Sequence, residues 1–423
     1  MRRIFSGIAL ALLLVIALDR TSDNPRSVIW SDAEGYYKYL PGLFILKDFH
    51  LLDAGSVWPY FNEKGEFVNK YSCGVAYFQA SFFLASYLMH LLTVKPDIDD
   101  YYNSAYARAM TVSGVVAGFL GLLLLWKTLR RSFSLSATAW TVLSVFLGTN
   151  LFHYTTKEMG ISHVYSFFLF SALIYTLPLY LRKPNILQSL ILGVILGWIV
   201  LIRPTNAIVF LLLLGYDVYS WDAFKERIGF FMSNLRSIVF IGIAAFLMWI
   251  PQLLYWKEMT GQWIYYSYTS EQFIYWNQPK IAAVLFDVQN GLFLYSPMVL
   301  LMLSGLIPAW KLGRAHAPVI SLLFALATYL FASWWAWWFG GAFGHRSYVE
   351  YYAILAFPLA YLLNLAFNCK RKIWGLLIRI VLALLIAFSV RLSYLYTTLP
   401  GPWDGEGWRW NWDKYLWVLK HLI

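Results

Sequence analysis

Long hydrophobic runs recur along the whole chain and are separated by short polar segments. A helix needs about 20 predominantly apolar residues to cross the hydrocarbon core of a membrane. Eleven runs approach this length, and they cover residues 4–18, 109–126, 135–152, 163–181, 187–202, 207–221, 237–256, 292–310, 318–335, 351–367 and 373–395. The pattern predicts an all-α polytopic membrane protein with about 11 transmembrane helices. Because no stretch remains for a separate soluble domain, we expect residues 1–423 to form a single transmembrane domain.

The first run follows Arg2 and Arg3, as the hydrophobic segment of a signal peptide would. No small-residue cleavage site follows it, and many further spans come later. We therefore interpret 4–18 as the first span.

Basic residues decide how one more apolar run, 73–94, is placed. If the amino terminus is cytoplasmic and 73–94 does not cross, five basic clusters fall inside, as the positive-inside rule favours. If 73–94 crosses, all five move outside. They are Lys127/Arg130/Arg131, Arg182/Lys183, Lys225/Arg227, Lys311/Arg314 and Lys370/Arg371/Lys372. We therefore expect 73–94 to be an amphipathic juxtamembrane helix at the outer surface, within a first outer loop of about 19–108.

Composition supports this topology. Hydrophobic residues make up 60% of the chain and charged residues only 13%, and the net charge is +11. In a soluble protein such a charge would suggest nucleic-acid binding, but the basic residues stand in short clusters between spans, so we expect no nucleic-acid partner.

Cys73 and Cys369 fall on opposite sides of the membrane in this topology and should not form a disulfide. No Cys/His cluster indicates a zinc site.

The outer loops contain three acidic residues that could accept a proton from a hydroxyl group. Asp32 and Glu34 lie about a dozen residues beyond the first span, and Glu158 lies in a very short loop between two apolar spans. A carboxylate near the membrane surface can act as a general base in transfer to a hydroxyl. The alternative is that these are solvated loop residues without a catalytic role.

The same loops contain candidate phosphate ligands. Arg203 and Arg346 stand at the mouths of spans, His345 precedes Arg346 in a glycine-rich loop, and Lys70 precedes the juxtamembrane run. A guanidinium group can bind a phosphate through two parallel hydrogen bonds, and a lysine binds it as a point charge. Such residues can also serve only as interfacial anchors whose charged ends reach the lipid headgroups.

Further residues could contact a substrate. Tyr36 lies in the acidic stretch, His163 opens a span, Tyr268 lies in an aromatic outer loop and Glu350 follows the glycine-rich loop. Aromatic rings suit sugar stacking, but they also form the interfacial belt of any membrane protein. The outer tail, 396–423, holds five tryptophans that either anchor it to the interface or cover an acceptor groove.

Acids and cations on one face of a membrane suit transfer of a sugar from a lipid phosphate. The phosphate is already a good leaving group, so the reaction needs a base for the acceptor and cations for the departing phosphate. The chain has neither a P-loop nor a GxGxxG motif at a strand–helix junction, which argues against a cytoplasmic nucleotide-sugar donor.

Three stretches resemble the GT-C superfamily of membrane glycosyltransferases, in particular the family-39-like protein O-mannosyltransferases and aminoarabinose transferases. They are SDAEGYYKYLP (31–41), NKYSCGVAYFQASFF (69–83) with the following Ala107-Arg108, and WWFGGAFGHRSYVEYY (337–352). Asp32 matches the catalytic aspartate of that family. The sequence departs from the family pattern where Ala33 separates the two acids and where Lys70 is followed by Tyr-Ser instead of Pro-Pro.

The resemblance implies a polyprenyl-phosphate-linked sugar as donor, a glycan, lipid or protein acceptor, and inversion at the anomeric carbon. It also implies a multi-pass protein of a cell membrane, such as the bacterial inner membrane, with the site on the periplasmic or extracellular face. Some relatives use a divalent metal, Mg or Mn, and others do not; the acids here could bind one, although nothing in the sequence requires it. The main alternative is a transporter or flippase of a lipid-linked saccharide, which would place charges near the midplane and use repeated, broken helices.

Overall fold

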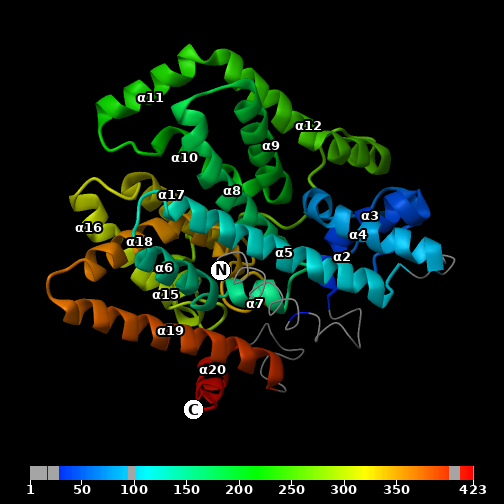
Figure 1. The fold of residues 1–423 in the computed structure, drawn as a ribbon. Coiled ribbons are helices and arrows are strands. Elements are labelled where there is room, and N and C mark those ends of the chain that lie inside the picture. The colour runs from blue at the N-terminus through cyan, green and yellow to red at the C-terminus, as the bar shows by residue number, and fades with distance from the viewer. Residues whose placement is uncertain (1–16, 18–27, 94–100, 400–409, 423) are drawn as a thin grey trace.

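The computed structural model describes residues 17, 28–93, 101–399 and 410–422, and these are almost wholly helical (Figure 1). The described part contains two short strands, β1 (Tyr60–Phe61) and β2 (Phe67–Val68). They pair antiparallel, with Tyr60 opposite Val68. Apart from Ala17, the predicted first span lies outside the described residues.

The ten other predicted spans all correspond to apolar helices. Four helices are long and apolar enough to cross a membrane: α5 (Ser104–Leu129), α8 (Ser162–Arg182), α12 (Leu235–Thr260) and α19 (Lys372–Thr398). Shorter apolar helices account for the rest: α6 (Leu135–Leu147), α9 (Ile186–Ile202), η5 with α10 (Pro204–Phe210 and Leu211–Gly215), α15 with α16 (Met298–Ser304 and Leu306–Lys311), α17 (Ala317–Ser333) and α18 (Tyr352–Phe367). The chain is therefore an all-α polytopic membrane protein, as predicted.

Two of the predicted spans are broken helices. The span 135–152 ends as α6 before Gly148, and the chain continues into the short α7 (Leu151–Thr156). The span 292–310 consists of α14 (Leu292–Tyr295), α15 and α16. At the α15–α16 junction, a Cβ on Gly305 would lie 2.2 Å from the carbonyl oxygen of Pro358 in α18. The break therefore coincides with a close approach of two backbones.

The run 73–94 forms one helix, α4 (Gly74–Thr93), as predicted. It packs against α5, and its first residue lies against the backbone of Ile202 at the end of α9. The preceding segment folds into α2 (Ser31–Tyr37), α3 (Tyr39–Pro41), a π-helical turn η2 (Gly42–Leu46) and a 3-10 turn η3 (Phe49–Leu51). In Figure 1, α2, α3 and α4 gather at one end of the molecule.

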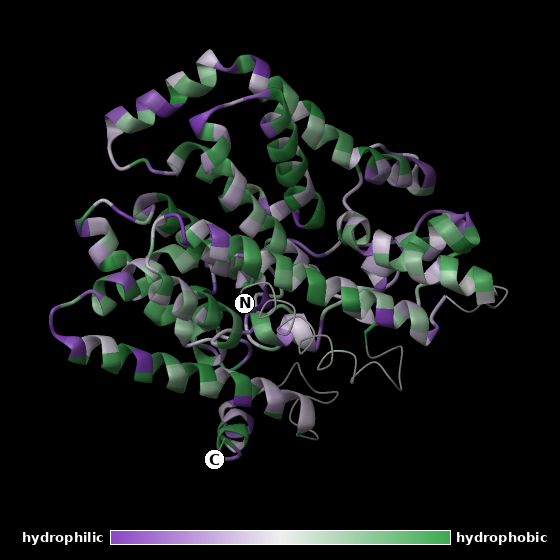
Figure 2. Ribbon diagram, viewed as in Figure 1, coloured by the Kyte–Doolittle hydropathy of each residue, from purple (hydrophilic) through white to green (hydrophobic). Residues whose placement is uncertain are grey.

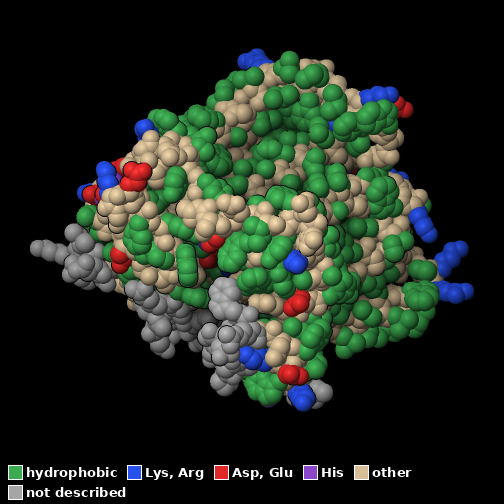
Figure 3. All heavy atoms as spheres, turned by 180° about the vertical axis from the view of Figure 1, so that it is seen from behind, with side chains coloured by type: hydrophobic (Ala, Val, Ile, Leu, Met, Phe, Trp, Pro, Cys, Tyr) green, Lys and Arg blue, Asp and Glu red, His purple; other side chains and the backbone are tan. Residues whose placement is uncertain are grey.

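The opposite end of the molecule holds α16, the start of α19 and α11 (Trp221–Ser233), which carry three of the five basic clusters (Figure 1). Figure 3 shows several Lys and Arg side chains and few acidic ones at this end, whereas acidic and basic side chains are mixed at the other end. This separation agrees with the predicted topology, which places the basic loops in the cytoplasm.

The core lies around α8, which packs against both α5 and α9. Only 11% of the residues in the most apolar part of α12, and 17% of those in α19, are buried inside the molecule. Figure 2 shows hydrophobic residues along these helices as well. Exposed apolar surface of this extent is typical of helices that face lipid.

The carboxyl-terminal helix α20 (Trp412–Leu419) packs against the rest of the chain through Trp410, Tyr415 and Val418. The Tyr415 hydroxyl donates a hydrogen bond of 3.0 Å to the Leu294 carbonyl. Trp412 and Trp417 point outward, with 55% and 39% exposure. The tail therefore uses one tryptophan for docking and presents two to its surroundings, while Trp403 and Trp408 lie outside the described residues.

Candidate functional site

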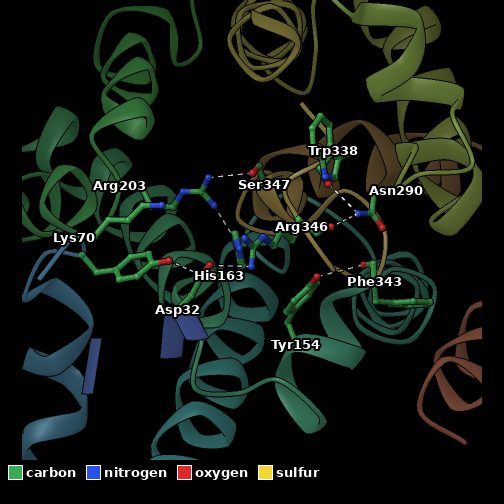
Figure 4. A network of polar contacts seen from close by, with 12 residues as sticks. Asp32, Lys70, Tyr154, His163, Arg203, Asn290, Trp338, Phe343, Arg346 and Ser347 are labelled. Carbon is green, nitrogen blue, oxygen red and sulfur yellow. Dashed lines mark hydrogen bonds and ion pairs between the residues drawn. The ribbon is translucent and has the colours of Figure 1, made fainter. Parts of the chain in front are cut away.

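Asp32 and Arg346, which are far apart in the sequence, form an ion pair at the end of the molecule that holds α2. Nη1 of Arg346 lies 2.9 Å from Oδ2 of Asp32, and each side chain is 19% exposed. The Tyr71 hydroxyl donates to the other carboxylate oxygen (Figure 4). Asp32 lies in the first turn of α2, whose start is fixed by a 2.7 Å hydrogen bond from the Ser31 amide to Ser56 Oγ.

The electrostatic surroundings keep Asp32 ionised. Burial alone would raise its pKa, but attraction by Arg346, the hydrogen bond from Tyr71 and attraction by Lys70 together bring the pKa below the ordinary value of 3.8. Burial opposes the charge of Arg346, yet Asp32 raises the pKa of the guanidinium overall. The pair thus combines a carboxylate able to accept a proton with a permanent cation.

Arg203 reaches the same region from the end of α9. Its guanidinium donates to His163 Nδ1 at 2.9 Å and to Ser347 Oγ at 3.0 Å (Figure 4). It also lies 3.5 Å from Oε1 of Glu350. Because Ser347 directly follows Arg346, the two arginines are held close to each other.

Glu350 lies beneath Arg203 and is fully buried. Asn206 donates a 3.1 Å hydrogen bond to Oε1, and His163 Nδ1 lies 3.4 Å from Oε2. Burial raises the pKa of Glu350, and Arg203 and Asn206 offset this only in part. These contacts show that Glu350 holds Arg203 in position. The sequence had instead suggested that Glu350 contacts the substrate directly.

Lys70 forms an ion pair with Glu271, a residue of the long loop between α12 and α13 (Ile281–Phe286). The lysine nitrogen lies 4.9 Å from the centre of the Tyr268 ring and 5.7 Å from that of Tyr71. The Tyr71 ring therefore lies between Lys70 and Asp32. Sequence reasoning identified Lys70 and Tyr268 but missed Glu271.

Helix α12 fixes the segment that carries Lys70. Its Gln252 accepts a 2.7 Å hydrogen bond from the Cys73 amide, and its Tyr255 hydroxyl accepts one of 2.8 Å from the Asn69 amide. The Asn69 side chain in turn donates to the Gly35 carbonyl of α2 at 2.6 Å. A span, the lysine segment and the aspartate helix are thus joined by buried hydrogen bonds.

Two asparagines hold the glycine-rich loop that precedes Arg346. The Asn290 amide donates to the carbonyls of Trp338 and Gly340 at 2.8 and 2.9 Å (Figure 4). The Asn150 amide donates to the Phe343 carbonyl at 3.0 Å. Gly340 has a φ of +76°, a conformation that residues with a side chain rarely adopt. The sequence pointed to the glycines but gave no signal for either asparagine.

Two of the predicted residues lie at the edge of this arrangement. His345 is 1% exposed, and its Nε2 lies 3.1 Å from the Trp337 carbonyl. Burial lowers the pKa of His345 to about 3, so the ring is neutral rather than a cation for phosphate. Glu158 lies 3.7 Å from His153 Nε2 and contributes to the field that raises the pKa of Arg346.

Glu34 belongs to a separate polar cluster on the other side of α2. It pairs with Lys38 at 3.1 Å, accepts a 3.0 Å hydrogen bond from the Ser56 amide and accepts another from the Tyr102 hydroxyl. The Tyr36 ring packs in a tilted arrangement against the Tyr71 ring, with the ring centres 4.9 Å apart. Glu34 is fully buried, so its contacts fix α2 and do not bring it beside Asp32.

The described residues contain no group of three His, Cys, Asp or Glu side chains that could hold a metal ion. The carboxylates Asp32, Glu271 and Glu350 each face a cation instead. In the described part of the chain, these three carboxylates are therefore held in ion pairs.

Comparison with known proteins finds no matching protein-family model, and no curated protein matches the chain in sequence. Solved structures do share its arrangement of helices. ArnT from Cupriavidus metallidurans, an aminoarabinose transferase solved in the apo state, matches with a TM-score of 0.55 and 12% identity, over 93% of this chain and 68% of ArnT.

A second match is the archaeal oligosaccharyltransferase AglB from Archaeoglobus fulgidus, solved with an inhibitory peptide and a dolichol-phosphate. The TM-score is 0.51 at 12% identity, over 97% of this chain and 56% of AglB, so the chain spans little more than half of that protein. Both are membrane glycosyltransferases of the GT-C type. This chain therefore has a GT-C-like fold.

Proposed function

We propose that the protein is a membrane glycosyltransferase that moves a sugar from a polyprenyl-phosphate donor to an acceptor hydroxyl, with inversion. The observation that carries this proposal is the Asp32–Arg346 pair, with Arg203 and Lys70 close by, at one end of a GT-C fold. All four residues come from loops that the charge pattern assigns to the outside. The site would thus face the periplasm or the exterior of a cell membrane, such as the bacterial inner membrane.

The residues fit a single displacement. Asp32 accepts the proton of the acceptor hydroxyl, whose oxygen bonds to the anomeric carbon as the bond from that carbon to the phosphate oxygen breaks. The lipid phosphate leaves with the bonding electron pair, and Arg346, Arg203 and Lys70 stabilise its charge. Attack opposite to the leaving group inverts the anomeric centre. No covalent enzyme intermediate is needed.

The direct contact between Arg346 and Asp32 gives the ion pair a further role in the proposed reaction. A lipid phosphate that attracts Arg346 would free one carboxylate oxygen for the acceptor. Donor binding and base activation are then coupled, which would limit proton abstraction to the loaded site.

The placement of the charges distinguishes this proposal from a transporter. Arg203 caps the end of α9, and His163 lies at the start of α8. A transporter for a lipid-linked saccharide is expected to hold its substrate near the membrane midplane. Charges gathered at helix ends suit a reaction at the membrane surface, with a glycan, lipid or protein as acceptor.

The test is mass spectrometry of lipids that co-purify with two variants. Asp32→Asn should abolish transfer without unfolding the protein, and it should retain a polyprenyl-phosphate sugar. Arg346→Ala should lose that lipid. Full transfer activity in Asp32→Asn, or no such lipid in any well-folded preparation, would refute the proposal.

A further inference from the structure

Glu271 lies in a long aromatic loop, but its side chain is held by specific polar contacts. Its carboxylate contacts Lys70 and accepts a 3.3 Å hydrogen bond from the Tyr60 hydroxyl. The Tyr266 hydroxyl donates to its main-chain carbonyl at 2.6 Å. The side chains of Glu271 and Lys70 are only 16% and 9% exposed. The pair is thus partly shielded from water, where a charge interaction is stronger than on an open surface.

The Lys70–Glu271 pair lies next to the Asp32–Arg346 pair. The Tyr71 side chain connects them, because its ring faces the Lys70 nitrogen while its hydroxyl donates to Asp32. In addition, Ser267 of the Glu271 loop donates a 2.6 Å hydrogen bond to the Lys70 carbonyl. The loop therefore holds both the side chain and the backbone of Lys70.

Charge balance indicates what Glu271 does there. A lysine ammonium group has three N–H donors, so a phosphate can approach Lys70 while Glu271 still contacts it. The two anions then repel each other at this partly shielded site, and each weakens the hold of Lys70 on the other. Removing the negative charge of Glu271 would remove this repulsion and leave Lys70 to the phosphate.

We propose that Glu271 competes with the lipid phosphate for Lys70 and thereby promotes release of the lipid phosphate product. This inference rests on the proposed function. Glu271 would weaken binding of the product. Its removal should tighten phosphate binding and slow turnover, which lowers KM and kcat together.

The experiment measures binding of undecaprenyl monophosphate to the detergent-purified full chain. Glu271→Gln should bind the lipid about tenfold more tightly than the unchanged protein. Lys70→Met should bind it more weakly, and adding Glu271→Gln to Lys70→Met should bring no gain. The matched control is Glu258→Gln, which removes an acid that is 55% exposed and lies 4.0 Å from His50. This control should leave the affinity unchanged.

The outcomes separate the two proposals. If neither Lys70→Met nor Arg346→Ala weakens binding, the proposed function itself fails. If both weaken binding but Glu271→Gln does not tighten it, only the role of Glu271 is overturned. An equal gain in Glu258→Gln, or a gain that persists without Lys70, would mean a general effect of charge and would also overturn it. Glu271→Ala provides a second variant, with thermal unfolding as the check that each protein is folded.

Discussion

At the scale of residues, the site consists of cations that each contact a carboxylate. Arg346 contacts Asp32, Lys70 contacts Glu271 and Arg203 approaches Glu350. Removing one partner from such a pair leaves a buried charge without compensation, which is more costly than losing the attraction itself. Every charge-removing substitution at these positions, Asp32→Asn and Arg346→Ala included, carries this cost, so thermal unfolding should be measured beside activity.

The hydrogen bond from Tyr71 to Asp32 predicts a shift in pH dependence. The pKa of Asp32 in the folded protein lies below the ordinary value of 3.8. The carboxylate is therefore ionised and able to accept a proton above its folded pKa, and activity is lost as the pH falls through this pKa. Tyr71→Phe removes one of the interactions that lower the pKa, so the acid limb of kcat/KM should move to higher pH. Tyr348→Phe, which removes a 2.7 Å hydrogen bond to Thr328, is the control and should leave the limb in place. An unchanged limb in Tyr71→Phe would contradict this role.

Residue types predicted much of the polar network but not its pairing. Asp32, Arg203 and Arg346 stood out because charges beside apolar spans are costly and rarely lack a purpose. Glu271 did not, because it is one acid in a loop of aromatic residues and its partner lies about 200 positions away. Glu34 appeared equivalent to Asp32, yet its position in α2 turns it toward Lys38 and Ser56. The catalytic roles stay predictions.

At the scale of elements, the packing of α9 on α12 depends on two glycines four positions apart. A Cβ on Gly193 would lie 2.3 Å from the Ile241 carbonyl, and one on Gly197 would lie 2.6 Å from Cα of Ala245. Small residues at this spacing let two membrane helices approach closely. Because α12 also holds the Lys70 segment through Gln252, this contact affects the site as well as stability.

Gly197→Ala should therefore destabilise the protein by about 1–3 kcal/mol, since the added methyl must push the two backbones apart. Gly242→Ala on α12 is the matched control, because a Cβ there would meet no atom within 4 Å. Thermal unfolding in detergent measures both. Equal unfolding temperatures for the two variants would refute the importance of the close contact.

Hydropathy predicted the helices well because the hydrocarbon core demands length and apolarity from every span. It could not predict where they break. Gly148 lies against the Met298 side chain of α15, and Gly305 lies against the backbone of α18 at Pro358. A count of apolar residues along the chain carries no information on such contacts between helices. The five basic clusters supplied the remaining information, from which we predict that 73–94 does not cross the membrane.

At the scale of the whole molecule, the two ends differ in charge and in chemistry. Chemical labelling of the two cysteines can test whether the two ends lie on opposite sides of the membrane. Cys369 is exposed at the start of the basic segment before α19, whereas Cys73 is buried beside the site. Burial raises the pKa of the Cys73 thiol to about 12, which leaves it almost wholly in the unreactive protonated form.

In intact cells, a membrane-impermeant maleimide should therefore not label this protein. After the membrane is opened, it should attach once per chain at Cys369, and Cys369→Ser should remove this label. Cys73 should react only after denaturation. Labelling of Cys369 from outside intact cells would reverse the topology and place the candidate site in the cytoplasm.

The Asp32–Arg346 contact also has a consequence for biosynthesis. Asp32 leaves the ribosome more than three hundred residues before Arg346, which at about 5–20 residues per second means tens of seconds. During that interval Asp32 lacks its ion-pair partner Arg346, and Lys70 lacks its partner Glu271 until that residue has also been synthesised. A chain released early would keep these charges unmatched. Membrane proteases would thus have a chemical means of telling an unfinished copy from a finished one.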